Sequence, residues 1–224
     1  MNKKLALGFI LVLASIVLPL LLAAGTLAWP AARIFIITFA AMTAAISLIL
    51  LRHDPALLKE RMKGLNQEGQ PRWDKLLLMA IRILWPGWLV LMGLDKRYHW
   101  SAVPIAVEVL GFAGVMAAWF GFYAVFRTNT FLVPVVRLQT ERGQHVISTG
   151  PYGIVRHPMY AAALVLFSST PLMLGSWWGL LGGLALLAVL VLRTSLEDRT
   201  LQQGLPGYAD YARRIKYRLV PLLW

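Results

Sequence analysis

The sequence predicts an all-α integral membrane protein, in which four transmembrane helices precede a C-terminal helical hairpin and five to six segments enter the membrane. Hydrophobic residues make up 58% of the chain and charged residues 14%, against about 25% charged residues in a typical soluble domain. The charged residues are clustered, and many of the uncharged runs between them approach the roughly 20 residues that a helix needs to cross a bilayer. This composition excludes an ordinary soluble domain.

The distribution of charge predicts how the chain is oriented. The net charge is +12, but the basic residues lie beside apolar runs, where membrane orientation and anionic lipid explain them better than nucleic acid does. The loop 52–75 is rich in Lys and Arg, so we expect this loop, the segment 127–159 and both termini on the cytoplasmic side. The absence of cysteine excludes disulfides, thiolate metal sites and a cysteine nucleophile.

Two apolar runs predict the first two transmembrane helices. The first run, Leu5–Ala28, contains Pro19 as a site for a kink. This run is longer than the about 7–15 apolar residues of a signal peptide, so we expect a retained helix, with a cleaved signal peptide as the alternative. Trp29 and Pro30 mark a turn at the membrane interface, and the second helix covers Ala32–Leu51.

The loop 52–75 contains a predicted short helix, Ala56–Met62. Asp54 is suited to cap its N-terminus, and Pro55 is suited to its first turn because proline lacks a backbone N–H. Leu57, Leu58 and Met62 give this helix one apolar side. We expect that side to lie on the membrane surface.

The next two apolar runs predict helices Leu76–Gly93 and Val103–Phe126, with Asp95–Trp100 as a short outer loop between them. A break is expected at Pro86-Gly87. Two charged residues, Arg82 and Glu108, lie inside these helices. Charged residues inside membrane segments are often functional, but these two fall at different depths, and structural and functional roles both stay open.

The last long apolar stretch predicts a helical hairpin, residues 160–203. Its arms begin as Tyr160–Leu174 and Trp177–Leu192, each shorter than a full crossing, so the hairpin either spans obliquely or turns back inside the bilayer. The second arm is expected to continue through Glu197 to about Gln203, where a Gly-Leu-Pro-Gly run ends it. The chain thus divides into a transmembrane scaffold, residues 1–126, and a second region, residues 127–224, that holds the hairpin and an interfacial tail.

The second region contains Gln139–Tyr160, the longest polar segment of a very hydrophobic chain. It contains a Gly-Pro-Tyr turn and the step Arg156-His157-Pro158, which opens a helix. The step has two interpretations: polar residues at a membrane interface, or an anion site where helix-start amides, Arg156 and His157 bind a carboxylate or phosphate.

A second candidate group follows the hairpin, where Arg193 and Glu197 lie four residues apart on one helix face. A surface ion pair contributes below about 1 kcal/mol, whereas charge at the mouth of a membrane cavity is more often functional. The four histidines have no metal-ligand spacing, so we predict no metal site. No glycine-rich dinucleotide fingerprint follows a strand.

Two long stretches of this sequence resemble one family. LQTERGQHVISTGPYGIVRHPMY and, after the apolar hairpin, LEDRTLQQGLPGYADYARRIKYRLVP are similar to the isoprenylcysteine carboxyl methyltransferases, integral membrane S-adenosylmethionine-dependent enzymes related to phospholipid methyltransferases. The resemblance extends from about Gln139 to Pro221. The loop sequence RHDPALLKERM is similar to bacterial members, so we expect an inner-membrane protein of a bacterium.

The resemblance implies S-adenosylmethionine as cofactor, held in a cytoplasmic pocket between the polar segment and the hairpin. The positions that match the family's cofactor-binding residues are Gln139, His145, Val146, Ile147, Tyr152, His157, Pro158, Tyr160 and Glu197. Arg193 matches the substrate arginine and is the expected catalytic residue. Helix-start amides near His157 are expected to bind the cofactor carboxylate. Where the family often has two glutamates, this chain has Glu197 followed by the shorter Asp198, whose role stays open.

The expected activity is methyl transfer to a lipid-like acceptor, with carboxyl O-methylation of an isoprenylcysteine-type substrate as the named family reaction. The acceptor would be a lipid or an isoprenoid-linked small molecule that enters from the bilayer, and no nucleic-acid partner is expected. Three alternatives remain: N-methylation of a phospholipid amine, an NADPH-dependent sterol-type reductase, and a scaffold or transporter subunit without activity. The sequence leaves the oligomeric state open.

Overall fold

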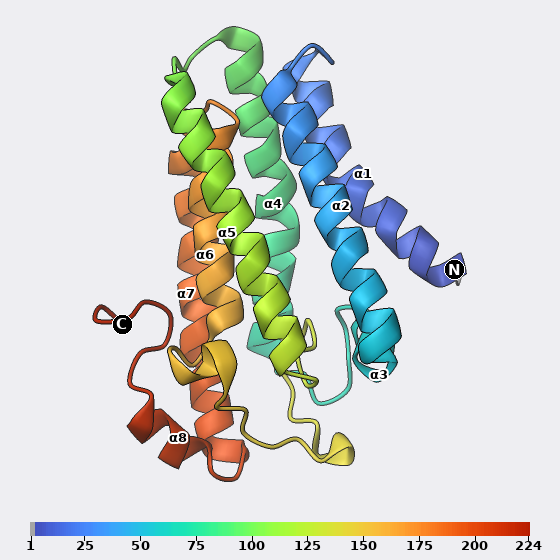
Figure 1. Cartoon of the computed structure of the whole chain (residues 1–224), viewed down its shortest axis with the longest axis vertical. Helices are drawn as coiled ribbons and strands as arrows, with labels where there is room; N and C mark the ends of the chain where they lie inside the picture. Colours follow the sequence, from blue (N-terminus) through green and yellow to red (C-terminus); the bar gives the residue numbers. More distant parts are fainter. Residues whose placement is uncertain (1–2) are drawn as a thin grey trace.

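The computed structural model describes residues 3–224, and it is a bundle of long helices with no strand in that part of the chain (Figure 1). The helices that are long and apolar enough to cross a membrane are α1 (Lys3–Ala24), α2 (Pro30–His53), α4 (Arg72–Tyr98), α5 (Ile105–Thr128) and α7 (Trp177–Gly204). Helix α6 (Pro158–Met173) is apolar but shorter. The predicted all-α membrane architecture, with four helices and a hairpin of α6 and α7, is confirmed.

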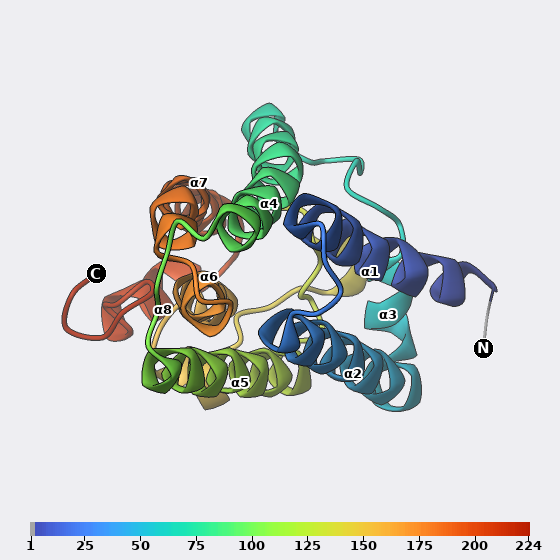
Figure 2. The ribbon, with the colours of Figure 1, turned by 90° about the horizontal axis from the view of Figure 1, so that it is seen from above.

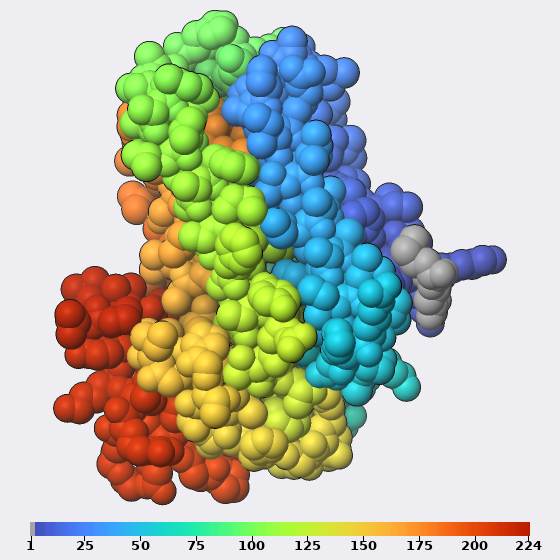
Figure 3. Space-filling view, in the orientation of Figure 1, coloured from blue at the N-terminus to red at the C-terminus, as the bar shows by residue number. Residues whose placement is uncertain are grey.

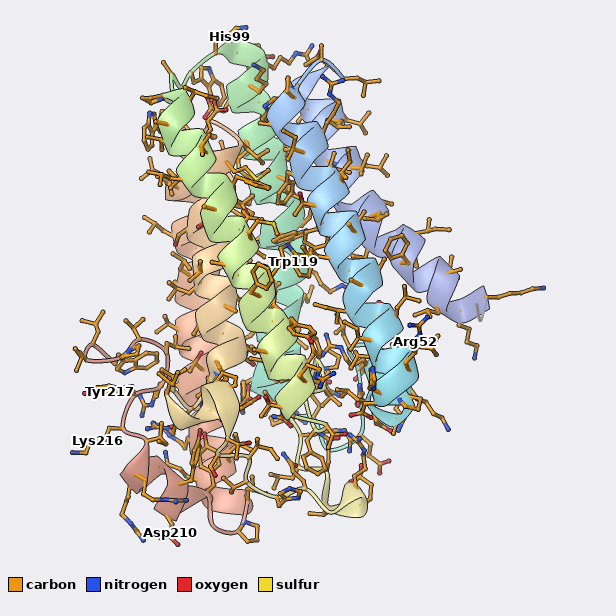
Figure 4. All side chains as sticks on the ribbon, viewed as in Figure 1. Arg52, His99, Trp119, Asp210, Lys216 and Tyr217 are labelled. Atoms are coloured by element: carbon orange, nitrogen blue, oxygen red, sulfur yellow. The ribbon has the colours of Figure 1, made fainter. Side chains whose placement is uncertain are left out.

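The small elements gather at one end of the bundle, which we call the polar end (Figure 1). They are the helices α3 (Pro55–Arg61) and α8 (Tyr208–Arg214) and the 3-10 turns η1 (Thr140–Arg142) and η2 (Gly150–Gly153). In the space-filling view the polar segment and the C-terminal residues cover this end (Figure 3). Most basic residues are therefore concentrated away from the end that carries His99 (Figure 4).

Helix α6 lies between α5 and α7, while α1 packs against α4 (Figure 2). Glycines permit the close approach of α5 and α6. A Cβ at Gly111 would lie 2.2 Å from the backbone N of Met173, and one at Gly114 would lie 2.1 Å from the Ser169 hydroxyl. Small residues at helix contacts are typical of membrane bundles, because packing there replaces the hydrophobic drive.

Helix α4 differs from its prediction in its interior and at its C-terminal end. It runs without interruption through Pro86 to Tyr98, and its C-cap residue His99 is in the left-handed conformation with φ 55°. Proline is tolerated inside membrane helices because the packed neighbours re-satisfy the freed backbone groups. The expected outer loop Asp95–Trp100 is therefore wrong in its first half. Asp95 is helical and buried, and it accepts hydrogen bonds from the hydroxyls of Ser101 and Ser176.

The loop helix α3 forms as predicted, with Asp54 Oδ1 accepting a hydrogen bond from Leu57 N at 2.9 Å. The expectation that its apolar side lies on the membrane surface is wrong for two of the three residues. Leu57 and Leu58 are buried in a cluster with Leu50 that also includes Phe126 and Leu132, and only Met62 stays exposed. Leu132 and Val133, which follow α5, pack against this side of the helix.

Candidate functional site

A cavity of about 350 Å³ lies at the polar end. Its walls are the polar segment, the start of α6, the last turns of α7 and the side chains of Leu78 and Ile81 on α4. All the residues predicted to bind the cofactor or the acceptor line it: Gln139, His145, Val146, Ile147, Tyr152, His157, Pro158, Tyr160, Arg193 and Glu197. The structure thus brings both candidate groups together, although their roles stay predictions.

Glu197 and Tyr160 join α7 to α6 inside this cavity. The Tyr160 hydroxyl donates to Glu197 Oε2 at 2.5 Å, and the His157 ring stacks on the Tyr160 ring with centroids 5.9 Å apart. Within residues 3–224, Glu197 Oε1 accepts no hydrogen bond and Glu197 has no cationic partner within 4.0 Å. This carboxylate is therefore available to a ligand.

Arg193 does not form the ion pair with Glu197 that their spacing suggested. Its Nε instead donates to Asp74 Oδ1 at 2.8 Å, and its Nη2 donates to the carbonyl of Pro134 at 2.8 Å. The guanidinium carbon lies 5.6 Å from the centroid of the Tyr160 ring. Of the hydrogen-bonding groups of Arg193, Nη1 has no acceptor in the described chain, so one edge remains for a ligand.

Asp74 is the partner that the sequence analysis missed. Its carboxylate is fully buried and also accepts hydrogen bonds from Gln70 Nε2 at 2.7 Å and from Val136 N at 3.0 Å. An acidic residue in the first turn of an apolar helix was the available signal. Its burial against α7 could not be read from the sequence.

Asp198, whose role the sequence left open, is the centre of a second buried cluster. Arg156 binds it with two hydrogen bonds, of 2.8 and 2.9 Å, and His157 Nε2 lies 3.1 Å from Oδ1. The Tyr208 hydroxyl donates to the same oxygen at 3.0 Å, and Arg218 donates to Oδ2 at 3.1 Å. Burial by itself would lower the pKa of Arg156, but the hydrogen bonds and charge of Asp198 raise it above its usual value.

The same cluster holds the C-terminal tail against the start of α6. Arg156 N donates to the carbonyl of Tyr217 and His157 N to the carbonyl of Arg218, each at 2.9 Å. Arg156 Nη1 also donates to two tail carbonyls, those of Ile215 and Lys216. The tail and Asp198 therefore occupy the amides of Arg156 and His157 and the Arg156 guanidinium. An anion site at the first amides of α6 itself stays a prediction.

The remaining predicted residues shape the wall of the cavity. The Tyr152 hydroxyl accepts a hydrogen bond from Asn129 Nδ2 at 2.7 Å, and burial raises the pKa of this phenol well above its usual value, which keeps it neutral. The Gln139 side chain donates to the carbonyl of Phe131 and accepts from Arg142, each at 2.6 Å. His145 is exposed and packs edge-on against Phe131.

Arg82 and Glu108 lie outside this site. Arg82 is exposed on α4, and Glu108 in the first turn of α5 is only half-buried, beside Gly175. The described residues contain no ion pair between them and no group of His, Asp or Glu side chains that could hold a metal ion. Neither residue contributes to the cavity.

Comparison with known proteins identifies one family whose model matches part of this chain. The model of the phospholipid methyltransferase family matches residues 105–206, from α5 to the turn after α7. No curated protein matches the chain. The matched region contains every predicted cofactor residue and Arg193, and it excludes Asp74. The chain is therefore an integral membrane protein whose residues 105–206 match the phospholipid methyltransferases, a family of integral membrane methyltransferases related to the isoprenylcysteine carboxyl methyltransferases.

Proposed function

We propose that this protein transfers a methyl group from S-adenosylmethionine to a lipid-like acceptor at the polar end of the bundle. The observation that carries the proposal is the cavity in which Glu197 and Arg193, one helical turn apart, each present an unpaired polar edge. The family match supports a membrane methyltransferase, for which S-adenosylmethionine is the usual methyl donor.

The residues of the cavity fit this cofactor. A volume of about 350 Å³ lies within the range of small-molecule sites. Glu197 Oε1 is free to accept a hydrogen bond from an amino or ribose hydroxyl group, and the Tyr160 and Phe131 rings add aromatic surface to the cavity wall. When bound, S-adenosylmethionine supplies an activated methyl group on a positively charged sulfur.

The acceptor that we propose is a carboxylate on an isoprenylcysteine-type lipid. Arg193 Nη1 would bind one carboxylate oxygen while the other forms the new bond to the methyl carbon. The carbon–sulfur bond breaks at the same time, and its electron pair goes to sulfur. Since no proton has to move, Arg193 acts by holding the oxygen in line, and positioning of this kind is a large part of catalysis.

N-methylation of a phospholipid amine is the second candidate, and one observation favours it. Asp74 compensates the charge of Arg193, whereas Glu197 has no cationic partner among residues 3–224. A cavity with an uncompensated carboxylate suits a cationic or zwitterionic head group. Glu197 would then accept the proton that an ammonium group must lose before its nitrogen can attack the methyl carbon.

Calorimetry on the purified protein in detergent tests the cofactor. Titration with S-adenosylhomocysteine should give a micromolar dissociation constant, and titration with NADPH should give no heat of binding. Binding of NADPH alone would replace the methyltransferase with a reductase. Methyl transfer to N-acetyl-S-farnesylcysteine and to phosphatidylethanolamine vesicles then distinguishes the carboxylate acceptor from the amine.

A further inference from the structure

Asp74 is a buried charge outside the region that the family model matches. It lies in the first turn of α4 and does not line the cavity. A carboxylate that is removed from water is costly unless it is paired and hydrogen-bonded. Two of the three side-chain hydrogen bonds of Asp74 come from Arg193 and from the backbone stretch that also binds Arg193, so its position calls for an explanation in terms of that arginine.

The two oxygens of Asp74 bind different partners. Oδ1 accepts from Arg193 Nε, while Oδ2 accepts from Val136 N at 3.0 Å and from Gln70 Nε2 at 2.7 Å. Arg193 Nη2 donates in turn to the carbonyl of Pro134. The stretch 134–136 is thus hydrogen-bonded to both members of the ion pair, and this stretch also forms part of the cavity wall.

These contacts fix the orientation of the guanidinium group. A free arginine side chain samples many rotamers, and binding of an acceptor would otherwise have to overcome the entropy of ordering it. Asp74 and Pro134 hold two of the three guanidinium nitrogens, and the third, Nη1, is left for the acceptor. The arginine is therefore ordered before the acceptor binds.

We propose that Asp74 is the positioning residue of the methyl-transfer site, acting through Arg193 without contacting cofactor or acceptor. This inference rests on the proposed function. It predicts that loss of the Asp74 charge weakens binding or turnover of the acceptor. Cofactor binding should stay intact, since neither Glu197 nor Tyr152 forms a hydrogen bond with Asp74.

The test compares Asp74→Asn with Asp95→Asn. Both aspartates are buried on α4, but Asp95 lies at the opposite end and binds serine hydroxyls. For the acceptor that the wild type methylates, we expect Asp74→Asn to raise KM or lower kcat/KM about tenfold or more, and to keep the dissociation constant of S-adenosylhomocysteine within about threefold. Asp95→Asn should change neither quantity. An equal loss of S-adenosylhomocysteine affinity and acceptor turnover in Asp74→Asn would overturn the inference.

The same substitution in an Arg193→Lys variant distinguishes a positioning role of Asp74 from a structural one. In Arg193→Lys the charge remains but no planar group is left to orient, so adding Asp74→Asn should lower kcat/KM less than about twofold. The same factor in both backgrounds would assign Asp74 a structural role only. Wild-type protein that binds no S-adenosylhomocysteine, or that binds it and methylates neither acceptor, would instead refute the proposed function itself.

Discussion

Two carboxylates that are neighbours in the sequence, Glu197 and Asp198, have different surroundings. Successive residues of an α-helix point about 100° apart. Glu197 therefore faces the cavity with one protein partner, the Tyr160 hydroxyl, whereas Asp198 is fully buried against Arg156 and the tail. The same chemical group is thus open to a ligand at one position and is bound within the fold at the next.

Replacement of Glu197 by alanine should weaken cofactor binding. A hydrogen bond to a charged group contributes about 1.5–3 kcal/mol, so we expect the affinity for S-adenosylhomocysteine to fall at least about tenfold, with Glu197→Gln in between. Isothermal titration calorimetry measures the change. Glu141→Gln is the control, because that carboxylate is exposed and bonds to Arg137. Unchanged binding in Glu197→Ala would remove Glu197 from the site.

Replacement of Asp198 by alanine should act on stability first. The change leaves the Arg156 guanidinium, whose side chain is 6% exposed, without its counter-charge, and breaking a buried ion pair costs about 3–5 kcal/mol. Thermal unfolding in detergent should show a large decrease in Tm. Asp210→Ala on α8 removes an exposed carboxylate and should change the stability by less than about 0.5 kcal/mol. Equal Tm values for the two variants would contradict the role assigned to Asp198.

At the level of elements, the close contact between α5 and α6 determines the position of α6, whose first turn lines the cavity. Helix α6 begins directly after His157, and its axis is fixed by the glycines of α5 that allow the backbones to meet. The α6–α7 turn is held at the other end, where Ser176 caps α7 and also donates to Asp95. At the polar end, the two helices of the hairpin are joined by the hydrogen bond from the Tyr160 hydroxyl to Glu197.

Replacement of Gly111 by alanine should push α5 away from α6. The added methyl group would lie 2.2 Å from the backbone N of Met173, which forces a backbone shift rather than a side-chain rotation. We expect a loss of several degrees in Tm and weaker S-adenosylhomocysteine binding. Gly87→Ala on α4 is the matched control, because nothing lies within 4 Å of its added Cβ and alanine favours a helix by up to about 1 kcal/mol. A Tm decrease in Gly87→Ala as large as in Gly111→Ala would refute the packing explanation.

At the scale of the whole molecule, the charges divide the bundle into two unlike ends. Among residues 3–224, the lysines and arginines beside the α1–α2 and α4–α5 turns are Arg33, Lys96 and Arg97. Arg52 and Lys216 lie toward the polar end (Figure 4). Positively charged loops remain on the cytoplasmic side during membrane insertion. We therefore propose that the polar end, with the cavity and the C-terminus, faces the cytoplasm.

Labelling of single cysteines tests this orientation, and the chain is convenient for it because it has none of its own. In intact cells, a membrane-impermeant maleimide should label Ala102→Cys, in the exposed loop before α5, and leave Lys216→Cys unlabelled. After permeabilisation both should react. The reverse pattern would place the cavity on the outer side.

The sequence by itself determined the features that depend on each segment's own interaction with its surroundings. The apolar runs predicted the membrane helices and the hairpin, and Asp54 with Pro55 predicted the start of α3, because hydrophobicity and capping are local properties. A family resemblance carried by the polar segment and the end of the hairpin indicated which side chains would share a cavity, and all of them line one.

Tertiary structure alone decided which charges pair. Arg193 and Glu197 are suitably spaced for an ion pair, yet Arg193 binds Asp74, 119 residues away in the sequence. One interpretation placed Arg156 at an anion site, whereas in the structure it binds Asp198 and the tail. In a buried site a charge takes the partner that the packed backbone brings within reach and shields from water, and sequence spacing does not contain that distance.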